Sequence, residues 1–262
     1  MKLEAFRPSI AENLFRCGSI NDGGYVIPRD LSLDLLISFG LGDDWNFERD
    51  ALKNNIFQRF VIFDHSVSRR LLFKKVIRSA KRIRQDPMNF VYRVRVLLRY
   101  SIHFLSRNHM KQKVVRDSKG RGEVQVKDIL DTYTSQASSC GLKIDIEGGE
   151  WTLLREVASF SKKIDLLIIE FHEINGHLEE YLNFKSQIDP FFELIHVHAN
   201  NFAQIGERGI PDVLEATFVR KNRFQVGTKR NYLPVHEFDA PCAPNRPDFS
   251  WDFVRSTVRL NT

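Results

Sequence analysis

Cysteine is scarce in this 262-residue sequence, and no long apolar run is present. The three cysteines, Cys17, Cys140 and Cys242, are odd in number and widely spaced, which argues against a disulfide framework and fits a reducing compartment. A membrane-spanning helix needs roughly 20 consecutive apolar residues, and no run in the sequence reaches that length. The N-terminal residues also lack the apolar core of a secretory signal. We therefore expect a cytoplasmic protein.

Acidic residues are nearly absent from one segment of the chain. Residues 66–121 contain 17 Lys and Arg but only 2 Asp and Glu, whereas the rest of the chain carries a net charge of −9. This split predicts a basic insert at 66–121, with a partner of its own, inside a single domain that spans residues 1–262. Residues 228–262 form a proline-rich tail, which we expect to wrap over the domain as an ordered loop or lid.

Short apolar runs alternate with helical patterns along the chain outside the insert. Near-continuous apolar runs are typical of strands buried on both faces in a parallel sheet, and the alternation of strand and helix predicts βαβ units. The predicted fold class is α/β, with a doubly wound, mostly parallel, seven-stranded Rossmann-like sheet. The expected strands cover 35–40, 60–63, 123–126, 142–146, 166–171, 194–197 and 213–219.

A glycine turn follows the first of these strands. Gly40 and Gly42 allow the backbone to approach a ligand at the carboxyl end of the strand, and Asp64 ends the next strand 22 residues after Gly42. An acidic residue about 20 residues after such a turn binds ribose hydroxyls in doubly wound sheets. Trp45 stands where a third glycine would pack against a pyrophosphate. The pattern predicts a nucleoside ligand without pyrophosphate and disfavours a nicotinamide-dependent oxidoreductase.

Polar residues end three later strands. A pair of carboxylates on one face of a strand is costly to bury unless it binds something, whereas Glu150 is explained by a favourable position at a helix N-terminus. Because ligands bind outside the carboxyl ends of such strands, these residues could supply a general base, metal ligands or hydrogen bonds to a substrate. The candidates are Asp145 and Glu147, then Glu170 and His172, then His196, His198 and Asn200.

The run LKIDIEGGEW at 142–151 resembles the signature of FkbM-type methyltransferases. Further segments, at 21–26, 38–48, 196–201 and 213–218, look similar to a methyltransferase-like branch of that family. The resemblance implies a Rossmann-like methyltransferase fold, S-adenosylmethionine as cofactor and typically O-methylation. The acceptor we expect is a hydroxyl on a small molecule, such as a sugar or natural product, or on a glycan or lipid-linked compound.

From their place at the strand ends, we expect Glu147, Glu170, His196 and Asn200 to contact the substrate. The resemblance implies which residues bind the cofactor. The cofactor residues are Gly40, Gly42, Asp43 and Asp64, with Gly23, Gly24 and Tyr25 expected to close over the cofactor.

A hydroxyl acceptor needs a base, and histidine titrates in the right range. We favour His172 or His198 as the base, with Asp145 orienting the substrate or the base. Alternatively, Asp145, Glu170 and a histidine could bind a divalent cation that acidifies the hydroxyl. We favour this alternative less and predict no metal ligands. A rival without catalysis is a methyltransferase-like scaffold that binds a membrane or a partner.

The basic insert contains two amphipathic helical patterns within 69–105. The simplest interpretation is that their apolar stripes pack on the sheet or on each other. A second is peripheral contact with the inner face of a membrane, because basic faces opposite Phe and Leu suit anionic headgroups. Nucleic-acid binding through Lys and Arg ranks last, since no nucleic-acid module is recognisable.

Overall fold

The computed structural model describes residues 3–104, 109–118, 120–234 and 237–260. Its centre is a seven-stranded sheet in the order β11-β12-β10-β9-β4-β5-β6, in which only β12 runs antiparallel to its neighbours. The predicted α/β class, with a doubly wound and mostly parallel sheet, is confirmed. The strands are β4 (Leu33–Phe39), β5 (Phe57–Phe63), β6 (His109–Met110), β9 (Cys140–Ile144), β10 (Leu166–Phe171), β11 (Phe192–Ala199) and β12 (Leu214–Arg220).

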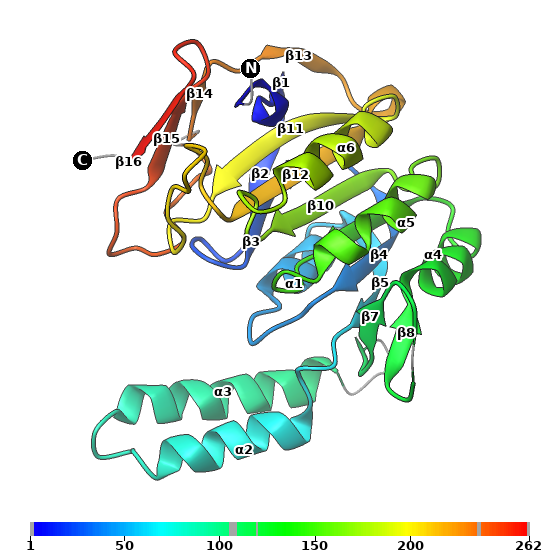
Figure 1. The fold of residues 1–262 in the computed structure, drawn as a ribbon. Helices are drawn as coiled ribbons and strands as arrows, with labels where there is room; N and C mark the ends of the chain where they lie inside the picture. The colour runs from blue at the N-terminus through cyan, green and yellow to red at the C-terminus, as the bar shows by residue number, and fades with distance from the viewer. Residues whose placement is uncertain (1–2, 105–108, 119, 235–236, 261–262) are drawn as a thin grey trace.

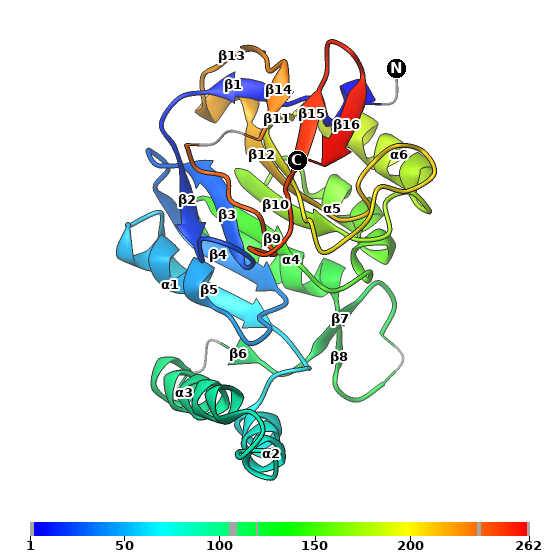
Figure 2. The same cartoon turned by 90° about the vertical axis from the view of Figure 1, so that its left-hand side faces the viewer.

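Helices cover both faces of this sheet (Figures 1 and 2), which explains why its strands are apolar on both sides. Every residue of β9 and β10 is buried. Along β4, Leu35 and Ile37 pack into the core of one face, and Leu36 packs into the core of the other. The first face carries α4 (Val126–Ser135), α5 (Leu154–Ser159) and α6 (Leu178–Ile188), and the second carries α1 (Asn46–Lys53).

One predicted strand lies outside the central sheet. The expected strand at 123–126 forms as β8 (Glu123–Gln125), but it pairs with β7 (Lys113–Val115) in a separate two-stranded sheet. The seventh strand of the central sheet is instead β6, which has two residues and therefore no readable period.

The N-terminal segment adds structure that the sequence did not predict. A short 3-10 helix, η1 (Leu3–Phe6), is followed by β1 (Ser9–Ala11), which pairs with β13 (Val226–Lys229) close to the other end of the chain. β2 (Leu14–Gly18) and β3 (Gly24–Pro28) form an antiparallel hairpin. Phe15 and Ile27 of this hairpin are buried in the same core as α1.

The basic insert is a helical hairpin that projects from one end of the molecule (Figures 1 and 2). Its helices are α2 (Arg69–Ala80) and α3 (Pro87–His103), and the side chains of Ser68 and Asp86 cap their N-termini. The predicted insert, 66–121, is not a separate unit, because β6 returns to the central sheet and β7 packs beside it. Leu105, the last residue of the predicted amphipathic segment, lies outside the described residues. None of the helices that the structure describes is long and apolar enough to cross a membrane.

The tail is ordered, as predicted, over its described part. A short η3 (Lys221–Arg223) precedes β13, and a small antiparallel sheet follows. Trp251 of this sheet is buried in the main core, which fixes the tail to the domain. The strands of the small sheet are β14 (Tyr232–Leu233), β15 (Phe249–Asp252) and β16 (Thr257–Leu260).

Candidate active site

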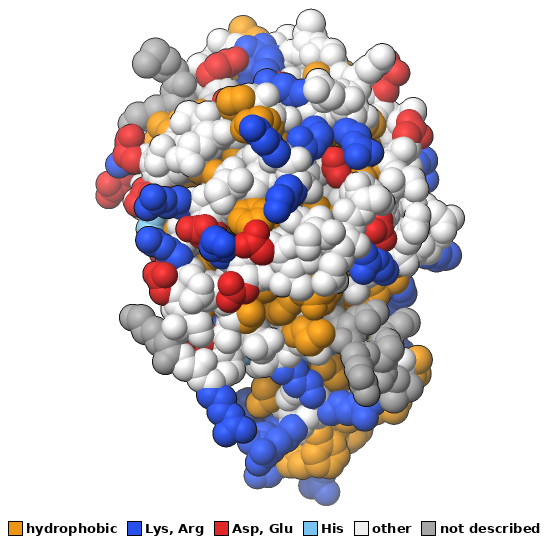
Figure 3. Space-filling model, turned by 90° about the vertical axis from the view of Figure 1, so that its right-hand side faces the viewer, with side chains coloured by type: hydrophobic (Ala, Val, Ile, Leu, Met, Phe, Trp, Pro, Cys, Tyr) orange, Lys and Arg blue, Asp and Glu red, His pale blue; other side chains and the backbone are white. Residues whose placement is uncertain are grey.

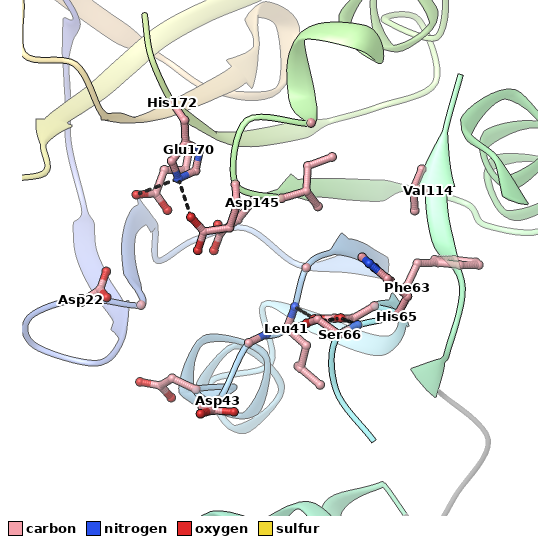
Figure 4. A pocket seen from close by; sticks show the side chains of 18 of the residues that line it. Asp22, Leu41, Asp43, Phe63, His65, Ser66, Val114, Asp145, Glu170 and His172 are labelled. Carbon is pink, nitrogen blue, oxygen red and sulfur yellow. Dashed lines mark hydrogen bonds and ion pairs between the residues drawn. The ribbon is translucent and has the colours of Figure 1, made fainter. Parts of the chain in front are cut away.

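A cavity of about 650 Å³ lies at the carboxyl ends of the parallel strands. The strand order reverses between β4 and β9, and this is the position where doubly wound sheets bind ligands. Its size falls within the range of small-molecule sites. Figure 4 shows Asp145, Glu170 and His172 close together at one end, and Leu41 and Ser66 at the other. No residue of the tail among those described lines the cavity.

The glycine turn brings β4 and β9 close together beneath the cavity. Gly40 has a φ of +87°, and a Cβ atom there would stand 1.7 Å from the carbonyl oxygen of Asp145. Only glycine fits this position, because any side chain would overlap the neighbouring backbone. The turn therefore positions Asp145 as well as the loop that follows Gly40.

Asp64 holds the glycine loop in place. Its Oδ2 accepts hydrogen bonds from the backbone N of Leu41 and Gly42 at 2.8 and 3.1 Å, and its Oδ1 accepts from the backbone N and Oγ of Ser66 at 2.5 and 2.7 Å. A carboxylate has about four acceptor positions, and all of them are used within the chain. The predicted ribose contact of Asp64 therefore requires a ribose hydroxyl to replace the Ser66 hydroxyl.

These hydrogen bonds also set the charge of Asp64. Burial raises the pKa of its carboxyl, but the bonds from Ser66, Leu41 and Gly42 outweigh burial and lower the pKa below its usual value. Asp64 is thus an ionised acceptor at neutral pH.

The remaining predicted cofactor residues divide into two groups. Gly23 and Asp43 line the cavity, and the carboxylate of Asp43 pairs with Lys75, at 2.7 Å, and with Arg93. Gly24 and Tyr25 do not line it. Gly24 begins β3, and the buried Tyr25 donates its hydroxyl to Oδ2 of Asp145 at 2.9 Å. Tyr25 can therefore act on the cavity only through Asp145, which corrects its predicted place over the cofactor.

Asp145 is supported by a buried lysine. Lys143 Nζ lies 3.3 Å from Oδ2 of Asp145 and 3.8 Å from Oε1 of Glu48, a buried residue of α1. Burial raises the pKa of Asp145. The charge of Lys143 and the hydrogen bond from Tyr25 lower this pKa by more than burial raises it, so the net shift is downward. Lys143 was not among the predicted site residues, although its spacing of two from Asp145 places both on one face of the strand.

The pKa of the Glu170 carboxyl is shifted upward, in contrast to that of Asp145. Burial and the negative charges of Asp145 and Glu215 raise the pKa of its carboxyl well above the usual value, although Asn200 Nδ2 donates to Glu170 Oε1 at 3.1 Å. Glu170 therefore holds a proton at a pH where Asp145 is ionised. Environments that separate the pKa values of two neighbouring carboxyls are typical of acid–base sites.

His172 is fixed by Glu150, a carboxylate with no exposed surface. Glu150 Oε1 accepts hydrogen bonds from the backbone N of His172, at 2.7 Å, and lies 3.1 Å from its Nδ1. The other ring nitrogen, Nε2, lies 3.6 Å from the exposed Glu147 and 4.0 Å from Glu170. A carboxylate on one imidazole nitrogen leaves the other free to take a proton.

The charge of His172 follows from the same contacts. Burial lowers the pKa of the imidazole, but the hydrogen bond and charge of Glu150 and the charges of Asp145 and Glu147 raise it above the usual value overall. The sequence pattern predicted a helix-capping role for Glu150 and did not predict its contact with His172. Glu150 begins the short helix η2 (Glu150–Thr152), so the predicted helix start is confirmed.

His196 and His198 lie outside the cavity, which corrects two predicted roles. Both side chains are buried. His198 has Nδ1 3.3 Å from Glu215 and Nε2 3.2 Å from Asp248, and His196 has Nε2 3.0 Å from Asp239. Both nitrogens of His198 lie within hydrogen-bond distance of buried carboxylates, and the ring does not line the cavity, so His198 offers no nitrogen to an acceptor there. The two histidines instead attach β11 to the tail.

Within the described part of the chain, two groups of side chains could hold a metal ion. Asp145, Glu170 and His172 each offer a ligand atom within 4.8 Å of the others, and so do the buried His198, Glu215 and Cys242. Carboxylate and imidazole ligands suit several divalent ions. The first group is the one that we considered, and did not favour, from the sequence.

Comparisons with known proteins were made for both sequence and structure. The sequence matches no model of a known protein family and no curated protein. Among solved structures, the chain is similar to a dimethyladenosine transferase from Plasmodium falciparum, with a TM-score of 0.37 and 9% identity over 74% of this chain and 57% of that one.

Two further solved structures are similar to a comparable degree. One is a Streptococcus pneumoniae protein assigned as a tRNA (m1A22) methyltransferase, in complex with S-adenosyl-L-methionine (TM-score 0.35, 13% identity, 80% of this chain and 72% of that one). The other is spermidine synthase from Thermotoga maritima (TM-score 0.35, 11% identity, 79% and 57%). The chain spans little more than half the length of the Plasmodium and Thermotoga proteins. Similarity at these TM-scores carries no functional assignment.

Proposed function

We propose that this chain is an S-adenosylmethionine-dependent methyltransferase. The composition of the cavity supports this function. One end has the glycine loop and the ionised carboxylate of Asp64, and the other has the imidazole of His172, which the buried Glu150 holds. Gly42, with a φ of +59°, lines the cavity and has no atom within 4 Å of the place where a Cβ would stand. The loop therefore leaves open space in which a nucleoside can bind.

The chain offers a contact for each part of such a cofactor. Asp64 is the acceptor for ribose hydroxyls, in exchange for the hydroxyl of Ser66. Phe63 and Val114 provide an apolar wall for a base. At the acidic end, the ionised Asp145 suits the positively charged groups of the methionine portion, and the protonated Glu170 can donate a hydrogen bond.

The acidic end also suits proton removal from a hydroxyl acceptor. When bound, S-adenosylmethionine would supply the methyl group: the acceptor oxygen would bond to the methyl carbon as the carbon–sulfur bond breaks, and the sulfonium would become the neutral thioether of S-adenosylhomocysteine. His172 takes the hydroxyl proton at Nε2, and Glu150 stabilises the imidazolium that results. Asn200 and Glu147 line the same end and can hold the acceptor. Holding the acceptor oxygen and the methyl group in near-attack geometry can supply several kcal/mol of the barrier.

We further propose that the chain is a member of the FkbM-type family and methylates a hydroxyl of a sugar, glycolipid or natural product. The signature at 142–151 supports this assignment, because Asp145, Glu147 and Gly149 line the cavity and Glu150 fixes His172. An N-methyltransferase would need no base for a neutral amine, whereas the Glu150–His172 pair supplies one.

The direct test is calorimetric titration of the full chain with S-adenosylmethionine, S-adenosylhomocysteine and NAD⁺. We expect the first two to bind at one site and NAD⁺ to show no heat of binding. Native mass spectrometry of the purified protein checks the same point, because a retained S-adenosyl ligand adds its mass. If neither S-adenosyl compound binds, the proposed function is wrong.

A scaffold without catalysis is the second candidate. The observation that favours it is the internal pairing of the loop, since Asp43 is bound by Lys75 and Arg93 and the acceptors of Asp64 are filled. Heat-shift measurements separate the two candidates, because a ligand that binds only the folded state raises the midpoint of unfolding. Stabilisation by S-adenosylmethionine favours the enzyme, and its absence favours the scaffold.

A further inference from the structure

The α2–α3 hairpin exposes large apolar side chains to an unusual degree. Of the 15 large hydrophobic residues that are exposed in the described chain, nine lie within this hairpin. Scattered exposed apolar residues are normal, whereas a concentration of them marks a binding surface. The nine residues are Leu71, Phe73, Ile77, Ile83, Met88, Val91, Tyr92, Leu98 and Ile102.

The exposed residues of α3 form a row along one side of the helix. Met88, Val91, Leu98 and Ile102 are separated by three, seven and four positions, which is the spacing of a single helical face. They are 75%, 48%, 58% and 68% exposed, so the rest of the described chain does not cover them. The opposite side of α3 packs on the domain, where Val96 and Tyr100 are buried.

Basic side chains surround this row. The hairpin contains 11 Lys and Arg within 69–103 and a single acidic residue, Asp86. Among the described residues, only Lys75 and Arg93 of these 11 have an acidic partner, which is Asp43 in both cases. Figure 3 shows blue and orange side chains side by side at the end of the molecule where the hairpin lies.

We propose that the α2–α3 hairpin docks the protein onto an anionic phospholipid surface. The apolar row of α3 inserts at the level of the headgroups, and the basic side chains contact the phosphates. Charge complementarity selects this occupant. A second copy of the chain would bring two strongly positive hairpins together, and they would repel. A nucleic acid would satisfy the charges but leave Met88, Leu98 and Ile102 without an apolar contact.

The base of the hairpin contacts the loop that lines the cavity. Lys75 and Arg93 pair with Asp43, and Arg99 donates to Asn46 Oδ1 at 2.9 Å. Trp45 packs edge-on against Tyr100 and Phe104, with ring centroids 5.9 and 5.6 Å apart. The docked hairpin would therefore hold the cavity at a fixed place relative to the surface. Docking does not depend on catalysis, so its test is independent of the proposed function.

The test is co-sedimentation of the full chain with vesicles, across a salt series. One set of vesicles contains phosphatidylcholine alone and the other contains equal parts of phosphatidylcholine and phosphatidylserine. We expect binding to the second set, weakened by salt. The variant Leu98→Gln/Ile102→Gln should bind at least about tenfold more weakly, and Arg70→Gln/Lys74→Gln should lose most of the preference for phosphatidylserine.

The matched control removes exposed apolar residues elsewhere, with Ile20→Gln/Val254→Gln. These residues are 74% and 64% exposed, and their loss should leave vesicle binding unchanged. All six substituted positions are on the surface, so circular dichroism should show that the three variants are folded. Absence of sedimentation with phosphatidylserine vesicles overturns the proposal, and so does an equal loss in the control. A gel shift with RNA or DNA at physiological salt, without vesicle binding, would reassign the surface to nucleic acid.

Discussion

Glu150 holds His172 through two atoms at once, the backbone N and ring Nδ1, at 2.7 and 3.1 Å from the same carboxylate oxygen. The backbone contact fixes the end of β10 and the ring contact fixes the imidazole. Because Glu150 has no exposed surface, water does not weaken either contact. The pair therefore behaves as one unit, and its effect on the titration of His172 can be measured without knowledge of the acceptor.

Glu150→Gln should lower the pKa of His172, because the hydrogen bond to a charged partner and its Coulomb attraction are both lost. NMR titration of the imidazole resonances measures this shift. In the wild-type protein we expect a pKa above the usual 6.5, and in the variant a lower one. Glu147→Gln is the control, since Glu147 lies farther from the ring and is 88% exposed. An equal shift in both variants would contradict the special role of Glu150.

Asp64→Ala should weaken S-adenosylmethionine binding by about tenfold or more, because a hydrogen bond to a charged acceptor contributes about 1.5–3 kcal/mol. Ser66→Ala removes the competing hydroxyl and keeps the carboxylate, so it should leave the affinity unchanged or raise it. Calorimetry compares the three proteins. The same affinity in Asp64→Ala and wild type would show that the ribose assignment is wrong.

Chelation should leave the protein unaffected if no metal is used. After treatment with EDTA, we expect no stoichiometric binding of Mg²⁺ or Mn²⁺ by calorimetry and, with an acceptor in hand, the same turnover with and without added Mg²⁺. Stoichiometric binding that disappears in Asp145→Asn would instead establish a cation site at Asp145, Glu170 and His172.

His198→Gln should reduce the free energy of unfolding by about 3 kcal/mol or more, because it leaves the buried Glu215 and Asp248 without a cation. Urea unfolding measures the loss, and His172→Gln, at a partly exposed site, should cost less. The contacts with Asp248, Cys242 and Glu215 outweigh burial and raise the pKa of His198 well above 6.5 in the folded state. The stabilisation is therefore complete below about pH 6.5 and declines as the pH rises through the folded-state pKa. A loss that grows with pH would contradict this assignment.

Hydrophobic spacing along the chain predicted the longer strands and the hairpin helices. The strand expected at 166–171 matches β10 residue for residue, because five of its six residues are apolar and only Glu170 is polar. β6 was missed because two residues carry no period. The hairpin helices were predicted, and Leu72, Leu97 and Phe104 of their apolar stripes pack on the domain. Leu98 of the same stripe is exposed, and helical spacing alone does not distinguish the two outcomes.

The sequence predicted the site residues at the strand ends but not the partners that lie far from them in the sequence. His196, His198 and Asn200 share a face of β11, but only Asn200 reaches the cavity. The two histidines meet Asp239 and Asp248, more than 40 residues away in sequence. Such contacts leave no trace in local spacing. Glu150 was misjudged for a related reason, since its partner His172 lies 22 residues farther along the chain.

The pairing of β5 with β6 has a consequence for the order of folding. Among the described residues, two residue pairs join these strands, Ile62 with His109 and Phe63 with Met110, and more than 40 residues lie between them in the sequence. Closing a long flexible loop for so short a ladder is unfavourable, whereas α2 and α3 are adjacent in sequence and can associate first. The hairpin then shortens the loop that β6 must close. We expect β6 to join the sheet late in folding and to be among the first strands to exchange its amide hydrogens.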